Sequence, residues 1–434
     1  MPTVAFHTLG CKVNTYETES VWNLFKNESY ERVDFKSEAD VYVINTCTVT
    51  NTGDRKSRQV IRRAIRRNPE AVIVVMGCYA QLKPKEIMDI EGVDIVVGTQ
   101  GREKLLDYVK QYQEERQPTL AVTNIMKQTE FEALDVEGFA ENTRAFLKIQ
   151  EGCNNFCTFC IIPWARGLIR SRDPKNVLEQ TQLLVEQGYK EVVLTGIHTA
   201  GYGEDFEEYS FADLLRDIDQ NVPGLERIRI SSIEASQVTD EVIEVLKNST
   251  KIVNHLHIPL QAGSDGVLKR MKRNYLTNFY RLKIQQLREV FSDLAITTDV
   301  IVGFPGETEK EFLETYEFCK EMQFSEMHVF PYSIRNGTPA AKMENQVPEL
   351  IKTARVSQLI ALNDQMAKEY ASSFEGSTLP VLFEEASKID AGYYVGHTTN
   401  YLRVEVLADD SCLGQILPVK IAKAGYPLNI GTLG

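Results

Sequence analysis

The sequence predicts an α/β protein with a β/α layered N-terminal domain, a central partial (β/α)6 barrel and a small C-terminal β-barrel. Three patterns carry this prediction. Strand-like and helix-like runs alternate through the first hundred residues, and six more strand–helix units follow between residues 145 and 330. Beyond residue 371 the pattern changes to short strands separated by turn residues. We therefore expect domains at 1–135, 136–370 and 371–434.

The N-terminal strands are expected to form one parallel sheet. The predicted strands are residues 4–9, 41–46, 72–77 and 94–98, and the predicted helices between them are 15–27, 54–67 and 84–89. The two middle strands are continuous runs rich in β-branched residues, which is typical of strands buried on both faces of a parallel sheet. The segment 111–142 is polar, acidic and weakly periodic, so it is expected to carry a linker.

Three cysteines occupy matching positions in this domain. Cys11, Cys47 and Cys78 each follow one of the first three strands. Parallel strands end at the same edge of their sheet, so these residues can meet in space although they lie about 30 residues apart. Small or turn-forming neighbours let the backbone approach a bulky group closely. Buried core cysteines are the plainer alternative. Three at equivalent strand ends instead predict a metal cluster with three protein ligands.

A second group of three cysteines follows the strand-like run 145–150. Cys153, Cys157 and Cys160 are spaced C-x3-C-x2-C, and the next histidine in the chain is His198. Closed structural zinc sites take four protein ligands, usually as two separated pairs. Buried or zinc-bound cysteines are alternatives, but neither explains this spacing. The motif predicts an iron–sulfur centre with one position left open.

The central segment repeats strand–helix units after this loop. Its further strands are expected at 191–195, 227–232, 255–259, 296–302 and 326–330, and its helices at 174–187, 239–248, 278–291 and 307–322. Such a series indicates an open version of the parallel barrel, with chemistry at the C-terminal strand ends. A set of polar or small residues lies at or near these ends: Thr195, Gly196, Ser232, Glu234, His257, Gln261 and Asp299. Each alone could be a cap or a satisfied core residue, but together they predict a ligand site.

The C-terminal region is predicted to form a helix at 352–370, followed by strands at 378–385, 393–398, 401–407 and 416–422. Short strands of this kind are typical of a small β-barrel. From residue 371 onward there are four Lys or Arg and seven Asp or Glu, a balance that does not favour electrostatic RNA binding.

These motifs together resemble the radical S-adenosylmethionine (SAM) methylthiotransferase family. The matching stretches around the first three cysteines are Gly10-Cys11-Lys12-Val13-Asn14, Asn45-Thr46-Cys47 and Gly77-Cys78-Tyr79-Ala80. The resemblance implies a [4Fe-4S] cluster held by Cys153, Cys157 and Cys160, whose open iron binds SAM. It also implies an auxiliary [4Fe-4S] cluster held by Cys11, Cys47 and Cys78, and a C-terminal RNA-binding domain of the TRAM type. SAM contacts are expected at Gly196, Ser232, Glu234, Gln261 and Asp299.

The resemblance implies a tRNA methylthiotransferase, which replaces a C–H bond of an adenine by C–SCH3. Such a bond resists acid–base chemistry and needs a radical. Residues 6–14 and 161–167 look most like the members that modify threonylcarbamoyladenosine at tRNA position 37, next to the anticodon. Members that act on isopentenyladenosine in tRNA or on a ribosomal-protein aspartate are alternatives. The expected partners are the tRNA anticodon loop and an electron donor, and the sequence does not identify the sulfur source.

The sequence also allows two interpretations from other functional classes: a non-catalytic electron carrier with two clusters, and a structural zinc protein. The polar strand ends and the TRAM-like tail disfavour the first. An electron carrier would neither cleave SAM nor bind tRNA, and a zinc protein would be colourless.

A basic run lies within the helix expected at 54–67. Arg55, Arg58, Arg62 and Arg66 fall on one helical face opposite an apolar stripe. Charge runs are commonly just solvated, but this one is of one sign and follows Cys47, so we predict that it contacts RNA phosphates. Two further basic groups can be either a solvated face or an RNA contact: Arg166, Arg170 and Arg172, and residues 269–273. Arg166 and 269–273 are also the expected source of positive charge for an anionic threonylcarbamoyl group.

Composition limits the remaining possibilities. The net charge of −13 over 434 residues argues against a protein that coats nucleic acid without specificity. No apolar run approaches the roughly 18 residues of a membrane helix, and the N-terminus shows no secretory signal pattern. We therefore expect a cytoplasmic protein with no membrane partner, in which the eight cysteines serve more readily as ligands than as disulfides.

Overall fold

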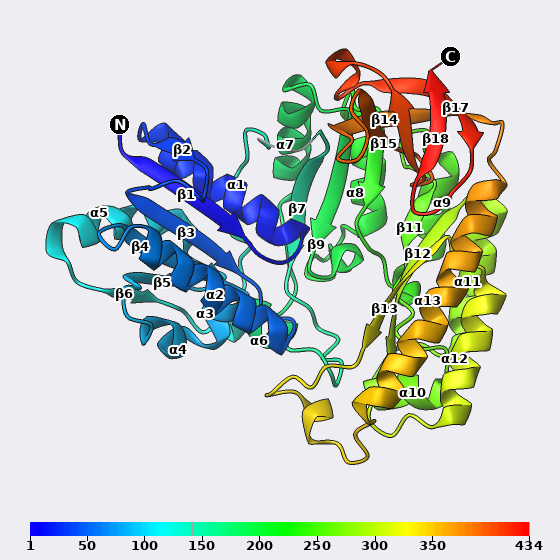
Figure 1. Cartoon of the computed structure of the whole chain (residues 1–434), viewed down its shortest axis with the longest axis horizontal. Helices are drawn as coiled ribbons and strands as arrows, with labels where there is room; N and C mark the ends of the chain where they lie inside the picture. The colour runs from blue at the N-terminus through cyan, green and yellow to red at the C-terminus, as the bar shows by residue number, and fades with distance from the viewer. Residues whose placement is uncertain (140–142, 434) are drawn as a thin grey trace.

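The computed structural model describes residues 1–139 and 143–433 and confirms the three-part α/β architecture (Figure 1). The first part is a parallel sheet in the order β2-β1-β3-β4-β5-β6. Its strands are β1 (Thr3–Thr8), β2 (Glu31–Val33), β3 (Val41–Thr46), β4 (Val72–Gly77), β5 (Ile95–Val97) and β6 (Thr119–Ala121). Its helices are α1 (Lys12–Asn27), α2 (Asn51–Arg67), α3 (Cys78–Leu82), α4 (Pro84–Met88) and α5 (Leu105–Glu115).

The β-branched runs behave as predicted. Every residue of β3 and of β4 is buried, because separate apolar clusters cover the two faces of the sheet. The sheet also extends further than expected. Helix α5 and strand β6 occupy the start of the segment 111–142 that was expected to be a linker, and residues 140–142 of that segment lie outside the described residues.

The central part forms two sheets that continue one another. One has the order β10-β9-β7-β8 and the other β11-β12-β13. Their strands are β7 (Ala145–Glu151), β8 (Arg170–Ser171), β9 (Glu191–Gly196), β10 (Arg227–Ile230), β11 (His255–His257), β12 (Ala295–Val302) and β13 (Glu326–Pro331). A parallel bridge from Ile228 to Ile252 lies between the two sheets. The six predicted strands are therefore present as parallel neighbours in an incomplete barrel, with β8 added antiparallel to β7.

The helices of the central part are α6 (Ile162–Arg166), α7 (Pro174–Glu186), α8 (Phe211–Asn221), α9 (Asp240–Asn248), α10 (Asp265–Met271), α11 (Thr277–Val290), α12 (Glu309–Met322) and α13 (Glu349–Ser372). One apolar core joins them to the strands. Helix α8 was missed from the sequence. A capping box at its start, in which Ser210 and Asp213 satisfy each other's backbone N–H groups, is the local signal that could have revealed it.

The C-terminal part is a closed barrel in the order β14-β15-β16-β18-β17. Its strands are β14 (Thr378–Ala386), β15 (Tyr393–Thr398), β16 (Arg403–Leu407), β17 (Ile416–Lys423) and β18 (Asn429–Leu433). Strand β18, which was not predicted, closes the barrel by pairing with both β16 and β17. The barrel docks onto the first residues of the central strands, where Arg227 donates a hydrogen bond to Pro380 O at 2.9 Å and Tyr401 stacks on His255 at 4.3 Å.

Over the described part of the chain, none of the helices combines the length and the apolar character that crossing a membrane would need.

Candidate active site

The three N-terminal cysteines lie at one edge of the first sheet. Their strands β1, β3 and β4 are neighbours, and Thr46 at the end of β3 pairs with Gly77 at the end of β4, so Cys47 and Cys78 follow at the same level. Gly10 has a φ of +113°, and a Cβ there would lie 3.0 Å from the Cβ of Cys47. The glycine before Cys11 is therefore needed for the backbone to pass the second cysteine.

The protonation of these thiols reflects their burial. Burial raises the pKa of Cys78 to about 12, opposed by the charge of Arg166 and assisted by those of Cys47 and Cys11. Burial also raises the pKa of Cys47. Metal binding would overcome this penalty, because a coordinating thiol is deprotonated by its metal. The three thiols thus form a close group that suits a thiolate-bound cluster.

The second group of cysteines is held on the loop that follows β7. The loop begins at Gly152, which has a φ of +77°; a Cβ there would lie 1.9 Å from Leu168 O, so only glycine fits. Cys153 N donates to Gly167 O at 3.0 Å, and Cys160 N donates to Cys157 O at 3.0 Å. Burial raises the pKa of both Cys153 and Cys160 to about 12. The loop therefore presents three thiols from a fixed backbone.

Each cysteine group has one buried arginine that donates to a sulfur. Arg166 Nε donates to Cys78 Sγ at 3.0 Å, and Arg273 Nη1 donates to Cys157 Sγ at 3.2 Å. Hydrogen bonds to sulfur ligands are one of the means by which proteins set the potential of an iron–sulfur cluster. The chain's own residues therefore fit two thiolate-bound clusters, each with a fixed cationic donor.

Arg166 also connects the two groups. It starts from α6, just after the central cysteine loop, and reaches Cys78 on the first sheet. Its Nη2 donates to Asn14 Oδ1 at 2.7 Å and to Glu17 Oε2 at 3.1 Å, both on α1. Its Nη1 donates to both oxygens of Glu151 at 3.2 Å. The two cysteine groups are thus tied together through one fully buried side chain.

Further buried charges complete this network. Glu17 accepts from Lys148 at 2.9 Å and pairs with Arg102, which in turn donates through Nε to Glu132 at 2.7 Å. Burial raises the pKa of Glu17, but the charges of Arg102, Arg166 and Lys148 outweigh it and hold that pKa well below its usual value. The network therefore consists of ionised, mutually paired groups between α1, β7 and α6.

This placement corrects the expectation for the basic residues near the central cysteines. Arg166, Arg170 and Arg172 are all buried, so they are neither a solvated face nor an exposed RNA contact. In the segment 269–273, Arg270 pairs with Glu311 at 2.9 Å and Arg273 with Glu234 at 2.9 Å. These arginines are already paired within the protein, which leaves them no free charge for an anionic substrate group.

Only some of the polar residues at the strand ends lie close to the central cysteine loop. Gly196 ends β9, and a Cβ there would lie 2.8 Å from Gln150 Oε1. Ser232 follows β10 and is half-buried, and Glu234 is held by Arg273 beside Cys157. Gln261 adopts a φ of +68°, and its N–H donates to Asp299 O at 2.9 Å.

His198 was not singled out from the sequence. Both of its ring nitrogens are buried without a hydrogen-bond partner among the described residues, and Glu234 Oε2 lies 3.9 Å from its Nε2. Its backbone N–H donates to Gln150 Oε1 at 2.8 Å, which places it next to Gly196. A buried imidazole without partners is costly, so this position suits a polar ligand group. Its place three residues after the end of the strand predicted at 191–195 was the available signal.

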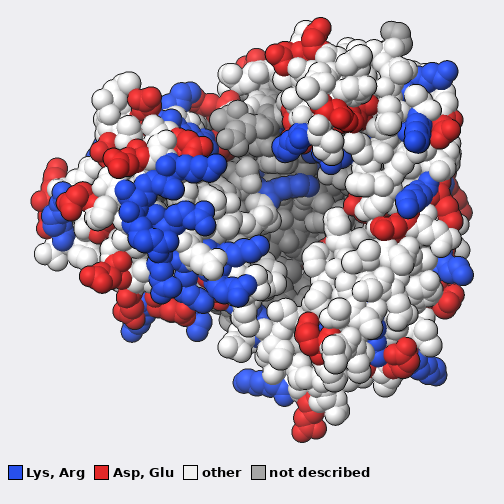
Figure 2. All heavy atoms as spheres, in the orientation of Figure 1, with Lys and Arg blue, Asp and Glu red and all other residues white. Residues whose placement is uncertain are grey.

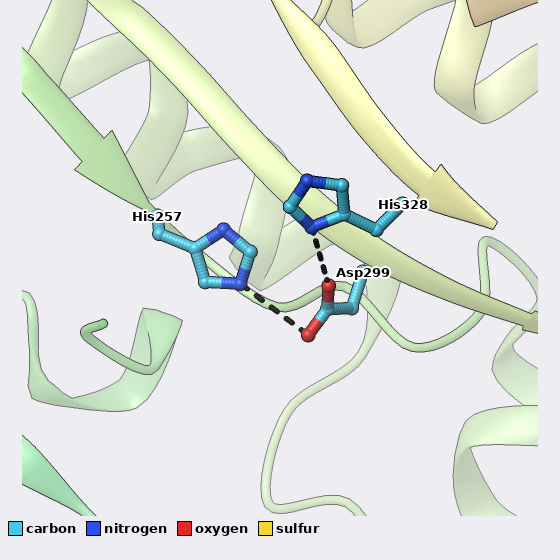
Figure 3. A group of neighbouring side chains, drawn as sticks. All are labelled: His257, Asp299 and His328. Atoms are coloured by element: carbon cyan, nitrogen blue, oxygen red, sulfur yellow. Dashed lines mark hydrogen bonds and ion pairs between the residues drawn. The ribbon is translucent and has the colours of Figure 1, made fainter. Parts of the chain in front are cut away.

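Asp299 lies between two histidines from neighbouring strands (Figure 3). His257 Nε2 lies 3.3 Å from Asp299 Oδ2, and His328 Nδ1 lies 3.2 Å from Asp299 Oδ1. His257 also approaches Thr297 Oγ1 through Nδ1 at 2.9 Å. Two imidazoles and a carboxylate can ligate a divalent metal, but here both carboxylate oxygens face ring nitrogens as hydrogen-bond acceptors. His328 was not predicted as a site residue.

The basic run forms an exposed band on α2. Arg55, Arg62 and Arg66 are exposed, while Arg58 is partly buried and donates to Tyr79 and Glu86. Figure 2 shows the band of basic side chains over α2, beside a deep hollow between the N-terminal part and the rest of the molecule. A surface groove of about 620 Å³ runs between Arg62, Arg66 and the acidic residues of the following helix and loop, Glu86, Asp89 and Glu91.

Reversing two charges of this band should weaken RNA binding. The variant Arg62→Glu/Arg66→Glu is expected to bind tRNA less tightly and with a flatter salt dependence, because each lost phosphate contact removes about 0.7–0.9 from the log–log slope. The measurement is tRNA affinity at several salt concentrations. Lys310→Glu/Lys320→Glu on the outer helix α12 is the matched control, with the same change in net charge. Equal affinities and slopes in the two double variants would show that the band is only solvated.

Comparison with known proteins identifies the family. Residues 3–98 match the model of the uncharacterized protein family UPF0004, and residues 147–319 match that of the Radical SAM superfamily. The chain is 65% identical over 433 residues to threonylcarbamoyladenosine tRNA methylthiotransferase MtaB of Bacillus subtilis (strain 168), covering 99% of this chain and 96% of that protein. The chain belongs to the radical SAM methylthiotransferase family.

Two further relatives are less similar to this chain. The Aquifex aeolicus (strain VF5) protein of the same description is 42% identical, covering 90% of this chain and 95% of that protein. The tRNA-2-methylthio-N(6)-dimethylallyladenosine synthase of Clostridium novyi (strain NT) is 37% identical, covering 96% and 93%.

A solved structure shows the same overall arrangement. The radical SAM methyltransferase TsrM from Kitasatospora setae superimposes with a TM-score of 0.57 at 14% identity, covering 91% of this chain and 80% of that chain. At this identity the likeness concerns the fold alone.

Proposed function

We propose that this methylthiotransferase converts threonylcarbamoyladenosine next to the anticodon, at tRNA position 37, to its 2-methylthio derivative. The observation that carries the proposal is the 65% identity, over 99% of the chain, to the Bacillus subtilis enzyme described by that activity. The synthase of Clostridium novyi, whose name specifies dimethylallyladenosine, is only 37% identical over a similar length. The proposed partner is therefore the anticodon loop of a tRNA that already carries the threonylcarbamoyl group.

Membership of the radical SAM family implies one [4Fe-4S] cluster and SAM. We assign this cluster to Cys153, Cys157 and Cys160, whose three thiolates leave one iron open for SAM. When bound and reduced, such a cluster supplies the electron that cleaves SAM and starts radical chemistry on an unreactive C–H bond. The external electron donor is a required partner that the chain does not itself provide.

We further propose that Cys11, Cys47 and Cys78 hold a second [4Fe-4S] cluster, through which sulfur reaches the substrate. The close grouping of the three thiols and the hydrogen bond from Arg166 to Cys78 support this assignment. Because the six proposed ligand thiols must stay reduced to bind metal, we place the protein in the cytoplasm.

The proposed SAM contacts are Gly196, Ser232, Glu234 and Gln261, with His198 added. Gly196, which has no side chain, and the ring of His198, which lacks a hydrogen-bond partner within the described ranges, both lie next to Gln150. Glu234 lies between His198 and Arg273. Asp299, which was also expected to bind SAM, is a weaker candidate because both of its carboxylate oxygens already face imidazole nitrogens.

The target base must leave its stack to reach both cysteine groups. Enzymes that act on a base extrude it from the nucleic acid, at a cost that is lowest in unpaired regions such as a loop. The hollow between the N-terminal part and the central part is the opening through which such a base would enter, and the basic band on α2 borders it (Figure 2). The proposed TRAM-like barrel, which is acidic overall, contributes less to electrostatic binding.

The decisive experiment is a turnover assay with defined tRNAs. The anaerobically reconstituted enzyme should form the 2-methylthio product from tRNA that carries threonylcarbamoyladenosine, detected by nucleoside mass spectrometry. The same tRNA without the modification should react poorly, because a site that hydrogen-bonds a substrate group rejects analogues lacking it.

Nucleoside analysis of tRNA from cells that lack this gene should show unmethylthiolated threonylcarbamoyladenosine. Efficient turnover of isopentenyladenosine tRNA or of a ribosomal protein, with none of the expected substrate, would refute the assignment and leave only the family's chemistry.

A further inference from the structure

The segment 332–343, which we call the bridging segment, follows β13 and contacts the loops of both cysteine groups. It is part of the connection between β13 and α13 in Figure 1. On the side of the central cysteine loop, Ala340 N donates to Thr158 O at 2.8 Å. Gly337 has a φ of +95°, and a Cβ there would lie 3.3 Å from Cδ1 of Ile161. The bridging segment therefore packs directly on the loop that carries the central cysteines.

Arg335, in the same segment, reaches the N-terminal part. Its Nη1 donates to Asp54 Oδ2 at 2.6 Å and to Asn51 Oδ1 at 2.9 Å, and its Nη2 donates to Thr48 Oγ1. Thr48 follows Cys47 directly, and the other two acceptors lie in the first turn of α2. The arginine side chain is only 5% exposed. One buried guanidinium thus holds the turn that leads from Cys47 into α2.

Among the described residues, this arginine and its neighbour make every hydrogen bond between the turn 48–54 and the central part. The neighbour is Ile334, whose carbonyl oxygen accepts from Asn51 Nδ2 at 2.8 Å. Within 1–139 and 143–433, Arg335 is also the only residue that forms an ion pair with Asp54. Removing the guanidinium would therefore release the turn from most of its polar contacts with the central part.

We propose that Arg335 is a positioning residue, which holds the turn after Cys47 at a fixed place relative to the central cysteine loop. The proposal rests on the proposed function, in which SAM is cleaved at the central cysteines and sulfur arrives through the N-terminal ones. Both must act on one atom of the substrate, and a misplacement of about 1 Å can slow a well-oriented reaction about 100-fold. Sulfur insertion should therefore depend on Arg335, whereas SAM cleavage, which needs only the central loop, should not.

A buried arginine can also act by stabilising the fold alone, and Arg355 provides the matched control for that role. Arg355 and Arg335 are each 4% exposed. Arg355 Nη1 pairs with Glu307 at 2.6 Å, the same distance as in the pair of Arg335 with its aspartate. The hydrogen bonds of Arg355 within the described chain go to Glu307 and Glu309, both in the central part. Arg355→Met should therefore lower the melting temperature about as much as Arg335→Met, without moving either cysteine loop.

The experiment measures how well SAM cleavage is coupled to sulfur insertion in the anaerobically reconstituted full-length enzyme. The readout is the ratio of 5′-deoxyadenosine released to methylthiolated nucleoside formed. Arg335→Met should keep the wild-type rate of SAM cleavage but raise this ratio roughly 10- to 100-fold. Arg335→Lys should give an intermediate ratio, because an ammonium can pair with Asp54 but lacks the planar fork that also reaches Thr48. Arg355→Met should keep the wild-type ratio.

Hydrogen–deuterium exchange and iron content of the same proteins supply readouts that do not depend on turnover. The backbone of residues 47–54 should exchange faster in Arg335→Met than in the wild type and should be unchanged in Arg355→Met. If Arg335→Met also loses iron, the loss should be confined to about four of roughly eight irons and should leave SAM cleavage intact, because only the loop of Cys47 is released. If Arg335→Met does not fold, Arg335→Lys decides the outcome by the same measurements.

The outcomes separate the proposal from the function on which it rests. An unchanged ratio together with unchanged exchange of residues 47–54 in the Arg335 variants would overturn the proposal. An equal rise of the ratio in Arg355→Met would overturn it as well, because lower stability alone would then explain the effect. Failure of the wild-type enzyme to modify any threonylcarbamoyladenosine tRNA would instead remove the proposed function. Hydrogen–deuterium exchange needs no substrate, so it would still decide whether Arg335 holds the turn after Cys47.

Discussion

Replacing Cys153, Cys157 and Cys160 together by Ala is expected to abolish reductive SAM cleavage and to halve the bound iron. The wild-type protein should hold close to eight irons after anaerobic reconstitution, from two four-iron clusters. The triple variant removes every proposed protein ligand of one cluster and leaves the other three cysteines in place. Iron analysis and the release of 5′-deoxyadenosine under reducing conditions measure the two effects.

The other cysteines of the chain provide the controls. Cys47→Ala should still cleave SAM, because the central loop is intact, but should fail to insert sulfur into tRNA. The double variant Cys319→Ala/Cys412→Ala changes two buried cysteines, one on α12 in the core of the central part and one in the core of the C-terminal barrel. This variant should keep the full iron content. Zinc in place of iron, or loss of all iron in the triple variant, would contradict the two-cluster assignment.

The strand pattern and the cysteine positions could be predicted because both are local signals. The continuous β-branched runs of β3 and β4 mark strands that are buried on both faces. The cysteines directly after them are brought together by the parallel pairing of adjacent strands. Nothing beyond sequence order and the rule for parallel sheets was needed to place them at one edge.

Three short strands could not be predicted in this way. Strands β2 and β6 have only three residues each, and β18 follows a turn-rich segment near the chain end. They are stabilised by pairing with neighbouring strands, such as β1 and β5, and not by a pattern of their own. Segments this short carry too few residues to show a period.

The environments of the charged site residues were also hidden from the sequence. Arg166 contacts Glu17 across 149 residues, a pairing that no local sequence pattern indicates. Such long-range partners are set by how the sheet, the open barrel and the C-terminal barrel pack together.

Arg166→Met is expected to destabilise the protein and to release iron selectively from the N-terminal cysteine group. The substitution removes the donor to Cys78 Sγ and leaves Glu17 and Glu151 with fewer cations in a fully buried site. Removing one partner of a buried ion pair costs roughly 3–5 kcal/mol, because the remaining charge stays desolvated. A lower melting temperature and partial loss of iron, with SAM cleavage retained, are the measurements.

Arg170→Met is the matched control for this prediction. Arg170, at the start of β8, is equally buried, but its guanidinium donates to the backbone oxygens of Leu168 and Arg166, both at 3.0 Å, and forms no ion pair within residues 1–139 and 143–433. Because the loss of Arg170 leaves no carboxylate without its partner, the melting temperature should fall less than in Arg166→Met. A further change of Glu17→Gln in Arg166→Met should recover part of the lost stability, since it removes the excess negative charge that the loss of Arg166 leaves in the buried network. Equal destabilisation by the two arginine variants, with no recovery from Glu17→Gln, would show that Arg166 only fills space and does not couple the two cysteine groups.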